Sequence, residues 1–196
     1  MNWLEPVAVA TGIISVYLSV KQKIWSWPTA LVNVALYFVV FREQKLYADM
    51  GLQVIYFVLS LYGWYEWLYG GENRTELKVS RADPRMAISL AAIAVVGVAV
   101  LGTLFARFTD AALPYVDSAT ATTSLVAQWM MTRKVLENWA VWIAVDVVYI
   151  GMFIYKHLYL TSGLYAGFLV LAVMGHRQWR RSFTAHHASA GDIVPA

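Results

Sequence analysis

The amino-acid sequence matches itself at an offset of 112 residues, and no other feature restricts its fold as strongly. The offset needs no gap and pairs residues of the same kind: Trp27 with Trp139, Tyr37 with Tyr149, Phe41 with Phe153, Gly63 with Gly175, and Trp67 with Trp179. Chance gives some matches in apolar sequence, but it does not keep tryptophan, tyrosine and glycine in one register. The chain is therefore predicted to contain two copies of one structural unit.

Composition places both copies in a membrane. Hydrophobic residues make up 60% of the chain and charged residues 14%, whereas soluble domains carry about a quarter charged residues. The 196 residues leave room for about seven spans of ~20 residues and for no separate soluble domain. The predicted fold class is therefore an all-α polytopic membrane protein. A net charge of +3, with the basic residues in loops, argues against a nucleic-acid partner.

Apolar segments predict seven transmembrane helices, over residues 6–20, 28–41, 47–69, 86–105, 118–132, 137–155 and 159–179. The first three match the last three, and the single helix between them makes both halves point the same way. Such a 3+1+3 arrangement of parallel repeats is a transporter architecture, with the substrate site at the repeat interface near the membrane midplane. On the last span, Gly163 and Gly167 are expected to allow close helix approach.

The same segments predict how the chain is divided. We expect a first repeat at 1–69, a cytoplasmic linker at 70–85, a central linking helix at 86–105, a second repeat at 106–181 and a disordered tail at 182–196. Eleven of the fifteen Lys and Arg residues lie in the loops after spans one, three and five or in the tail. Because basic loops stay in the cytoplasm, this bias predicts an outside amino terminus and a cytoplasmic carboxyl terminus.

The best candidate for a functional site is residues 137–149, which hold the one carboxylate that lies deep inside an apolar segment. On a helix, five side chains share one face there: Asn138, Trp139, Trp142, Asp146 and Tyr149. An ionisable residue at membrane depth is a functional candidate by default, and two Trp residues one turn apart offer a wall for a cationic or aromatic ligand. The alternative is that the Trp residues belong to an interfacial belt and that Asp146 fixes a helix contact.

Three other predicted helices carry polar faces that would meet the first around a central cavity. These faces hold Asn33 and Tyr37 on the second span, Gln53 on the third, and Ser124 and Gln128 on the fifth. Polar faces inside a membrane look at protein or water and not at lipid. A passive scaffold or receptor would not need such faces on four helices, so a substrate pathway is favoured.

Enzyme chemistry is not indicated, because the spans hold no set of acid, base and nucleophile, no zinc-protease motif and no glycine-rich phosphate loop. His186 and His187 could bind a metal, but the small, polar tail around them favours disorder. No catalytic residue, no metal site and no cofactor is therefore predicted.

Two long segments resemble the nicotinamide riboside transporter (PnuC) family of bacterial inner membranes. These are WSWPTALVNVALYFVVFREQKLYADMGLQVIYFVLSLYGWYEW in the first half and DSATATTSLVAQWMMTRKVLENWAVWIAVDVVYIGMFIYKHLYLTSGLYAGFLVLAVMGHRQWRR in the second. The resemblance implies a fold similar to that of the SWEET sugar carriers, a homotrimer, and facilitated diffusion of a vitamin that a cytosolic kinase then traps. It also implies a substrate-site Trp-x-x-Trp motif, which matches Trp139 and Trp142. The polar site positions that it implies match Asn33, Gln53, Ser124, Gln128 and Asp146. Similar transporters carry thiamine or other vitamins, so the cargo is expected to be nicotinamide riboside, with thiamine or another aromatic vitamin as the alternative.

Overall fold

The computed structural model describes residues 3–43, 47–109, 113–155 and 157–191, and the described residues form an all-α fold. Its seven α-helices are α1 (Leu4–Val20), α2 (Ser26–Glu43), α3 (Tyr47–Tyr69), α4 (Pro84–Phe108), α5 (Pro114–Thr132), α6 (Asn138–Tyr155) and α7 (Tyr159–Gly191). A short 3₁₀ helix, Glu72–Arg74, lies in the linker between α3 and α4. The predicted fold class and number of helices are confirmed.

The helices differ in length and in mean hydropathy. By length and composition alone, three could cross a membrane: α4, α6 and the Tyr159–His186 part of α7. Helix α1 is apolar but only 17 residues long. Helices α2, α3 and α5 carry the polar faces predicted above, and these polar residues lower their mean hydropathy.

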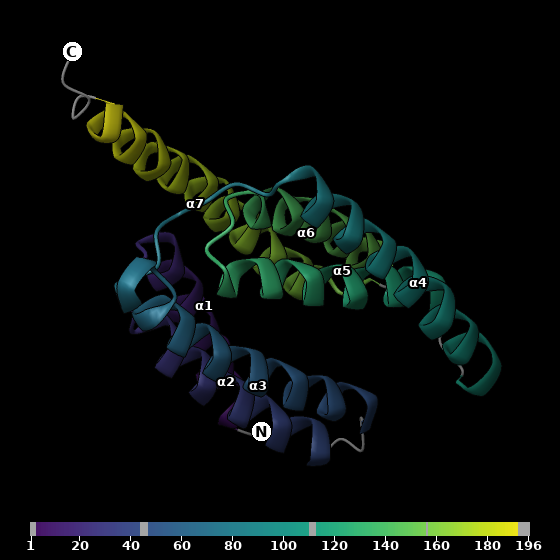
Figure 1. Ribbon diagram of the computed structural model, residues 1–196. Helices are drawn as coiled ribbons and strands as arrows, with labels where there is room; N and C mark the ends of the chain where they lie inside the picture. The colour runs from purple at the N-terminus through teal and green to yellow at the C-terminus, as the bar shows by residue number, and fades with distance from the viewer. Residues whose placement is uncertain (1–2, 44–46, 110–112, 156, 192–196) are drawn as a thin grey trace.

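Helix α7 is longer than predicted. The sequence predicted a disordered tail from residue 182, but α7 is helical to Gly191, so this prediction is wrong for the described part of the tail. A helix of 33 residues is about 50 Å long, well beyond the ~30 Å hydrocarbon core of a bilayer. The carboxyl-terminal part of α7 therefore projects from the helix bundle (Figure 1).

The two repeats are visible as two groups of three helices. Helix α2 packs against both α1 and α3, and α6 packs against both α5 and α7, while α4 lies along α5. The main contacts between the groups are α1 with α7 and α3 with α5, two pairings that the 112-residue offset interconverts. The repeats are thus related by an approximate two-fold axis, as parallel repeats require.

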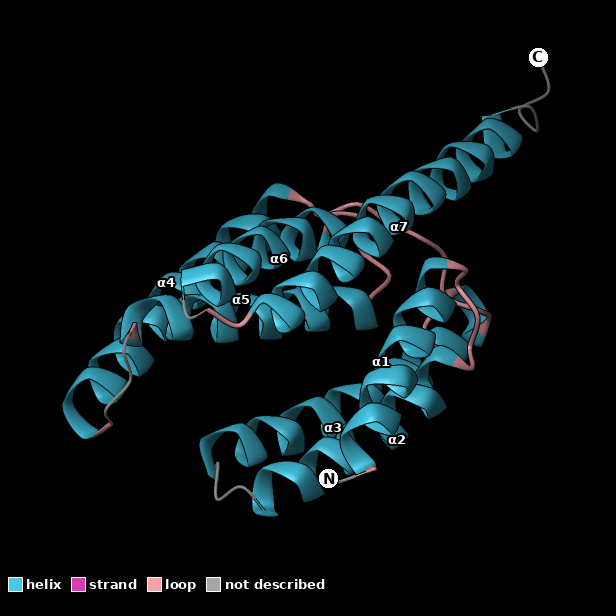
Figure 2. Ribbon diagram, turned by 180° about the vertical axis from the view of Figure 1, so that it is seen from behind, coloured by secondary structure: helices cyan, strands magenta, loops and turns pink. Residues whose placement is uncertain are grey.

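The groups meet at one end of the molecule. We call this the basic end; it carries the loops 21–25, 70–83 and 133–137 and the projecting part of α7. From there the ribbons of α1–α3 and α4–α7 diverge toward the opposite end in both views (Figures 1 and 2).

The turns at the basic end repeat in detail. Gln22 and Lys134, which the offset pairs, both have left-handed backbone conformations, with φ of 54° and 48°. In each turn the next residue donates back to the preceding helix, Lys23 N–H to Leu18 O at 2.9 Å and Val135 N–H to Met130 O at 3.0 Å. The same hydrogen bonds thus reverse the chain in both repeats.

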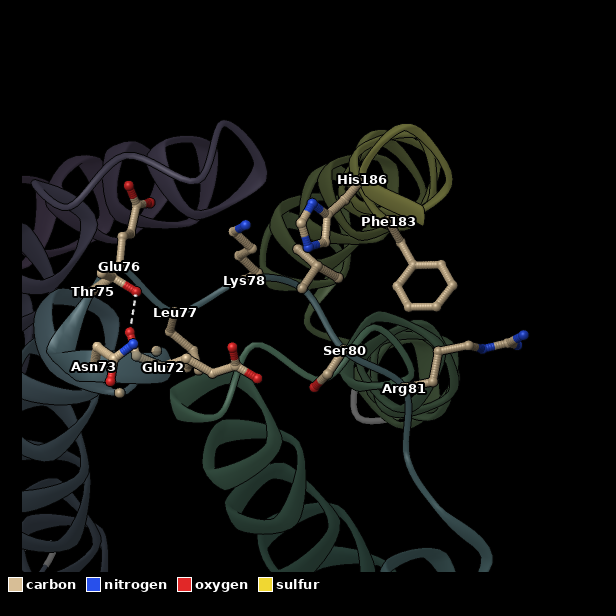
Figure 3. A pocket seen from close by; sticks show the side chains of 13 residues that line it. Glu72, Asn73, Thr75, Glu76, Leu77, Lys78, Ser80, Arg81, Phe183 and His186 are labelled. Atoms are coloured by element: carbon tan, nitrogen blue, oxygen red, sulfur yellow. Dashed lines mark hydrogen bonds between the residues drawn. The ribbon is translucent and has the colours of Figure 1, made fainter. Parts of the chain in front are cut away.

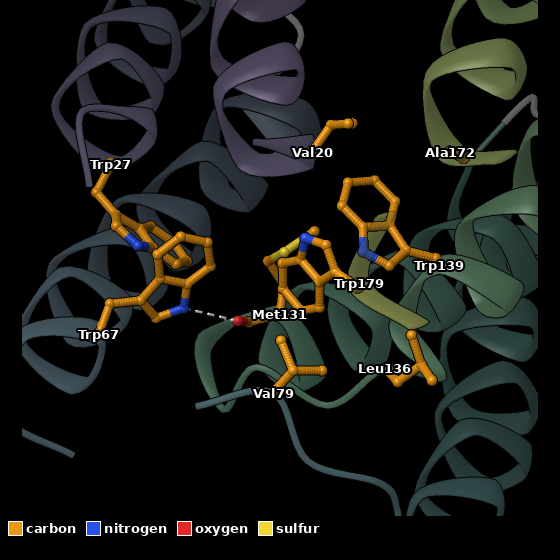
Figure 4. Close-up of a cluster of buried hydrophobic side chains, with 9 residues drawn as sticks. All are labelled: Val20, Trp27, Trp67, Val79, Met131, Leu136, Trp139, Ala172 and Trp179. Carbon is orange, nitrogen blue, oxygen red and sulfur yellow. Dashed lines mark hydrogen bonds between the residues drawn. The ribbon is translucent and has the colours of Figure 1, made fainter. Parts of the chain in front are cut away.

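Tryptophan side chains fill the space between the repeats at the basic end (Figure 4). The buried core cluster there consists of Val20, Trp27, Trp67, Val79, Met131, Leu136, Trp139, Ala172 and Trp179. Trp27 lies directly on Gly63, and Trp139 lies directly on Gly175, so a Cβ atom at either glycine would overlap the indole ring. By contrast, nothing lies within 4 Å of where a Cβ of Gly163 or Gly167 would be, so the prediction of close approach there is wrong.

We expect Gly63→Ala and Gly175→Ala each to lower the free energy of unfolding by about 1–3 kcal/mol, because each added methyl group overpacks a buried indole. Gly167→Ala is the matched control: its methyl group meets open space, and alanine favours the helix by up to ~1 kcal/mol. Thermal unfolding of the purified protein in detergent measures all three. Equal unfolding temperatures for Gly175→Ala and Gly167→Ala would contradict the packing described here.

Candidate functional site

Polar side chains gather where α3 meets α5 and α6. Ser124 of α5 is only 3% exposed, and its hydroxyl has no hydrogen-bond partner of good geometry among the described residues. The phenols of Tyr56 and Tyr149 both approach this hydroxyl, and Tyr149 also approaches Thr120. The ring of Tyr149 lies 4.6 Å, centroid to centroid, from that of Tyr165 of α7. Hydroxyl groups from four helices thus face one small region between the repeats.

Asp146 borders this region from α6. Its side chain is nearly fully buried, at 4% exposure, and no salt bridge to it forms within the described part of the chain. Its charge lies close enough to act on Tyr165. A buried carboxylate without a cationic partner is costly to keep inside a protein, so it is more easily explained by a ligand than by stability.

Two glutamines supply further polar groups. Gln53 of α3 and Gln128 of α5 are half-buried, and neither side-chain amide makes a hydrogen bond within the described residues. Each amide offers two donors and one acceptor, which suits a ligand that carries both kinds of group. Tyr37 of α2 instead stacks on Phe41 with ring centroids 5.5 Å apart, as Tyr149 stacks on Phe153 at 5.8 Å.

Three of the predicted site residues are engaged in packing within their own repeats. Asn33 donates to the Ala8 carbonyl oxygen at 2.6 Å and holds α2 against α1. Asn138 is fully buried and donates to the Val135 carbonyl oxygen at 2.6 Å. Trp139 is 1% exposed and packs edge-on to Trp179, with ring centroids 5.4 Å apart.

The internal symmetry separates the two Trp residues of the predicted motif. Trp139 has a counterpart, Trp27, which is buried in the same way over the equivalent glycine. Trp142 is half-buried against the core cluster, and its counterpart is Ala30. The architecture of the repeat thus accounts for Trp139, whereas Trp142 is an addition specific to the second repeat.

The same comparison applies to the other polar positions of α5 and α6. The counterparts of Thr120, Ser124, Gln128 and Asp146 are, in order, Ala8, Gly12, Val16 and Val34. The two repeats share a backbone fold but not a chemistry. A polar ligand would therefore be held by the second repeat together with α3.

Tyr56 and Tyr165 were not among the predicted site residues, although the structure places both beside Tyr149. A signal for each was available. Tyr56 lies one helical turn after Gln53 on the polar face of α3, and Tyr165 is the residue that the 112-residue offset pairs with Gln53.

A separate groove of about 710 Å³ lies on the outside of the basic end (Figure 3). Residues 70–81 of the linker form most of it, and Phe183 and His186 of α7 close one side. None of the predicted substrate residues lines this groove, so it is distinct from the region between the repeats.

Seven helices, arranged as two parallel three-helix repeats and one linking helix, with polar faces that meet between the repeats, define this chain as a polytopic membrane transporter. The family model described as "Nicotinamide mononucleotide transporter" matches residues 2–181, and the chain belongs to this family, which includes PnuC. The identification made from the sequence is thereby confirmed, as is the conclusion that the chain is a transporter and not an enzyme.

Individual relatives cover most of the chain. It is 30% identical to the nicotinamide riboside transporter PnuC of Escherichia coli K12, over 93% of this chain and 87% of that protein. It is 26% identical to the riboflavin/roseoflavin transporter RibM of Streptomyces davaonensis, over 90% of this chain and 84% of that protein. The crystal structure of the vitamin B3 transporter PnuC superimposes with a TM-score of 0.74 and 30% identity, covering 94% of this chain and 83% of that one.

We expect Trp139→Ala to lower the free energy of unfolding by about 3–5 kcal/mol, because it empties a buried core position. Trp142→Ala should cost less stability and instead weaken binding of the vitamin that the protein transports. Thermal unfolding and calorimetric titration of the two purified variants separate the roles. Wild-type stability of Trp139→Ala together with lost binding would assign Trp139 to the ligand instead.

Proposed function

We propose that this protein carries nicotinamide riboside into the cytoplasm by facilitated diffusion, and that phosphorylation inside the cell traps the cargo. The observation that carries the proposal is Asp146, which is buried, makes no salt bridge among the described residues and borders the hydroxyl and aromatic groups between the repeats. Nicotinamide riboside is a flat aromatic cation joined to a polyhydroxyl sugar. The carboxylate and the Trp142 ring suit the cation, and Ser124, Gln128 and Gln53 suit the sugar and the carboxamide.

A second candidate cargo is a flavin, because RibM is named as a riboflavin/roseoflavin transporter. A flavin also joins an aromatic ring to a hydroxylated chain, but its ring is neutral at pH 7 and does not need a carboxylate. Thiamine is a cation but lacks the sugar hydroxyls. The charge of Asp146 therefore favours a cationic cargo, and the hydroxyl-rich surroundings favour a riboside.

The proposed mechanism is uniport. The described residues contain no ATP-hydrolysing motif, and a single buried carboxylate does not make a proton relay. Net uptake would then follow the gradient that a cytosolic kinase maintains. The family resemblance further leads us to propose a homotrimer, in which each chain carries its own pathway between its two repeats.

Purified protein in liposomes should equilibrate labelled nicotinamide riboside without any ion or voltage gradient, and a kinase with ATP sealed inside should make the label accumulate. Asp146→Asn should weaken binding of the riboside by about tenfold, or ~1.4 kcal/mol, through loss of the charge. Riboflavin or thiamine uptake without riboside uptake would replace the cargo. Accumulation of unmodified riboside driven by an ion gradient would rule out uniport.

We further propose that the basic end faces the cytoplasm. Single cysteines at Thr75 or Ser182, both exposed at the basic end, should be protected from a membrane-impermeant thiol reagent in intact cells. Single cysteines at Thr109 or His157, exposed at the opposite end, should be labelled. The chain has no native cysteine, so the introduced cysteine is the one thiol of this protein that the reagent can label. The reverse labelling pattern would invert the orientation.

A further inference from the structure

Two hydrogen bonds that the repeat symmetry interconverts hold the repeats together at the basic end. The indole N–H of Trp67 in α3 donates to the Met131 carbonyl oxygen near the end of α5, at 3.0 Å (Figure 4). The indole N–H of Trp179 in α7 donates to the Ser19 carbonyl oxygen near the end of α1, also at 3.0 Å. Each repeat therefore donates one of these hydrogen bonds from an indole N–H and accepts the other at a backbone carbonyl oxygen.

These contacts close the basic end. Trp67 is 1% exposed and Trp179 is fully buried, and their rings lie 5.8 Å apart, centroid to centroid, between the repeats. A polar substrate between α3 and α5 would have to pass this buried Trp pair to reach the basic side. At least one of the two seams, α1–α7 or α3–α5, must separate for transport.

Unsatisfied polar groups at the basic end also disfavour the closed arrangement. Four buried polar atoms beside the Trp pair have no hydrogen-bond partner among the described residues: Ser26 Oγ, Trp27 Nε1, Asn138 Oδ1 and Trp139 Nε1. The offset pairs Ser26 with Asn138 and Trp27 with Trp139. Unpartnered buried polar atoms oppose the closed state, and water admitted at an opening seam would relieve that cost. This is the balance expected of a contact that opens and closes.

The two seams are not equally strong, because the linker reinforces only one. On the α3–α5 side, the buried Lys134 ammonium donates to the Leu77 carbonyl oxygen at 2.7 Å and to Glu76 Oε1 at 3.1 Å. It also lies 4.5 Å from the centre of the Trp67 ring. The linker is fixed to the α5–α6 turn by Ser80, which donates to the Lys134 carbonyl oxygen and accepts from the Leu136 amide.

A further contact on the same side joins the helices directly. Arg133, just after α5, pairs with Glu66 of α3 at 3.0 Å and donates to the Tyr62 hydroxyl at 2.9 Å. On the α1–α7 side, the counterpart of Lys134 is Gln22, which makes one exposed hydrogen bond to Ser182 Oγ at 2.9 Å. Apart from the shared Trp contact, the contacts among the described residues include several charged and backbone contacts at the α3–α5 seam and one exposed side-chain hydrogen bond at the α1–α7 seam.

We propose that the α1–α7 seam is the gate through which substrate leaves at the basic end, and that the α3–α5 seam is the hinge about which the repeats turn. Trp179 and Gln22 are then gate residues, and Lys134, Arg133 and the linker hold the hinge. None of them touches substrate, so they act on transport by positioning the repeats. The proposal rests on the transport function proposed above.

Paired cysteines and a short bifunctional methanethiosulfonate test this in proteoliposomes. Tethering Gln22→Cys to Ser182→Cys should reduce uptake at least tenfold, leave riboside binding from the opposite side unchanged, and be reversed by a reductant. Tethering Tyr62→Cys to Arg133→Cys, across the hinge, is the matched control and should leave at least half of the uptake. Single-cysteine variants treated in the same way should transport normally.

The assignment would be overturned if both tethers abolished uptake, if neither tether reduced it, or if only the Tyr62–Arg133 tether reduced it. Spin labels at the same two pairs give a readout that needs no substrate. The 22–182 distance should show a second, longer population, while the 62–133 distance keeps one. If no variant, treated or untreated, takes up the riboside, the proposed cargo fails, and the two distance distributions still decide between gate and hinge. One population for 22–182 together with two for 62–133 would reverse the roles.

Discussion

The structure depends on two indole-to-carbonyl hydrogen bonds, Trp67 to Met131 and Trp179 to Ser19, which join the repeats at a single end. Because the helices of the two repeats diverge from that end, the polar faces of α3, α5 and α6 are held close without being sealed into an ordinary core (Figures 1 and 2). A membrane protein cannot rely on the hydrophobic effect to press helices together. Close packing of large rings on glycine, together with directional hydrogen bonds, supplies the specificity instead.

The two repeats share a backbone fold but differ in many side chains, so they contribute equally to the fold and unequally to the proposed ligand site. The positions that build the fold are the same in both copies: a Trp on a Gly, a Tyr on a Phe, and a turn with one left-handed residue. The positions of α5 and α6 that would meet a ligand are polar, whereas their counterparts in the first copy are Ala8, Gly12, Val16 and Val34; the first copy instead contributes Gln53 and Tyr56 of α3. Among the described residues, Ser124 is buried without a hydrogen-bond partner and Asp146 is buried without a salt bridge, and the fold itself does not explain these two groups.

Much of this could be predicted from the sequence, because the signal was a repeat of large, rare residues. Apolar segments and the spacing of polar residues predicted the seven helices and their polar faces, and the register of Trp, Tyr and Gly predicted the parallel repeats. It did not show which Trp of the 139–142 pair is buried, because both lie on one helix face and only the neighbouring helix decides. The spacing of Gly163 and Gly167 is typical of glycines at a close helix contact, yet on α7 it is Gly175 that lies beneath an indole ring.

The prediction for the end of α7 failed for a different reason. Small polar residues after 181 have the composition of a disordered tail, but composition does not register a continuous helix that begins in the membrane and continues to Gly191. Likewise, the reinforcement of one seam by Lys134 depends on where a linker with no regular pattern crosses the α5–α6 turn. Long-range contacts of that kind leave no periodic trace in the sequence.

A crystal or cryo-EM structure of the protein with nicotinamide riboside bound would show directly where the substrate lies. The ligand is predicted to lie between α3 and the α5–α6 pair, in contact with Trp142, Ser124 and Asp146 and above an intact Trp67–Trp179 contact. Density for the ligand in the linker groove, or against α1 and α2 and away from Asp146, would show that the polar region between α3, α5 and α6 is not the substrate site.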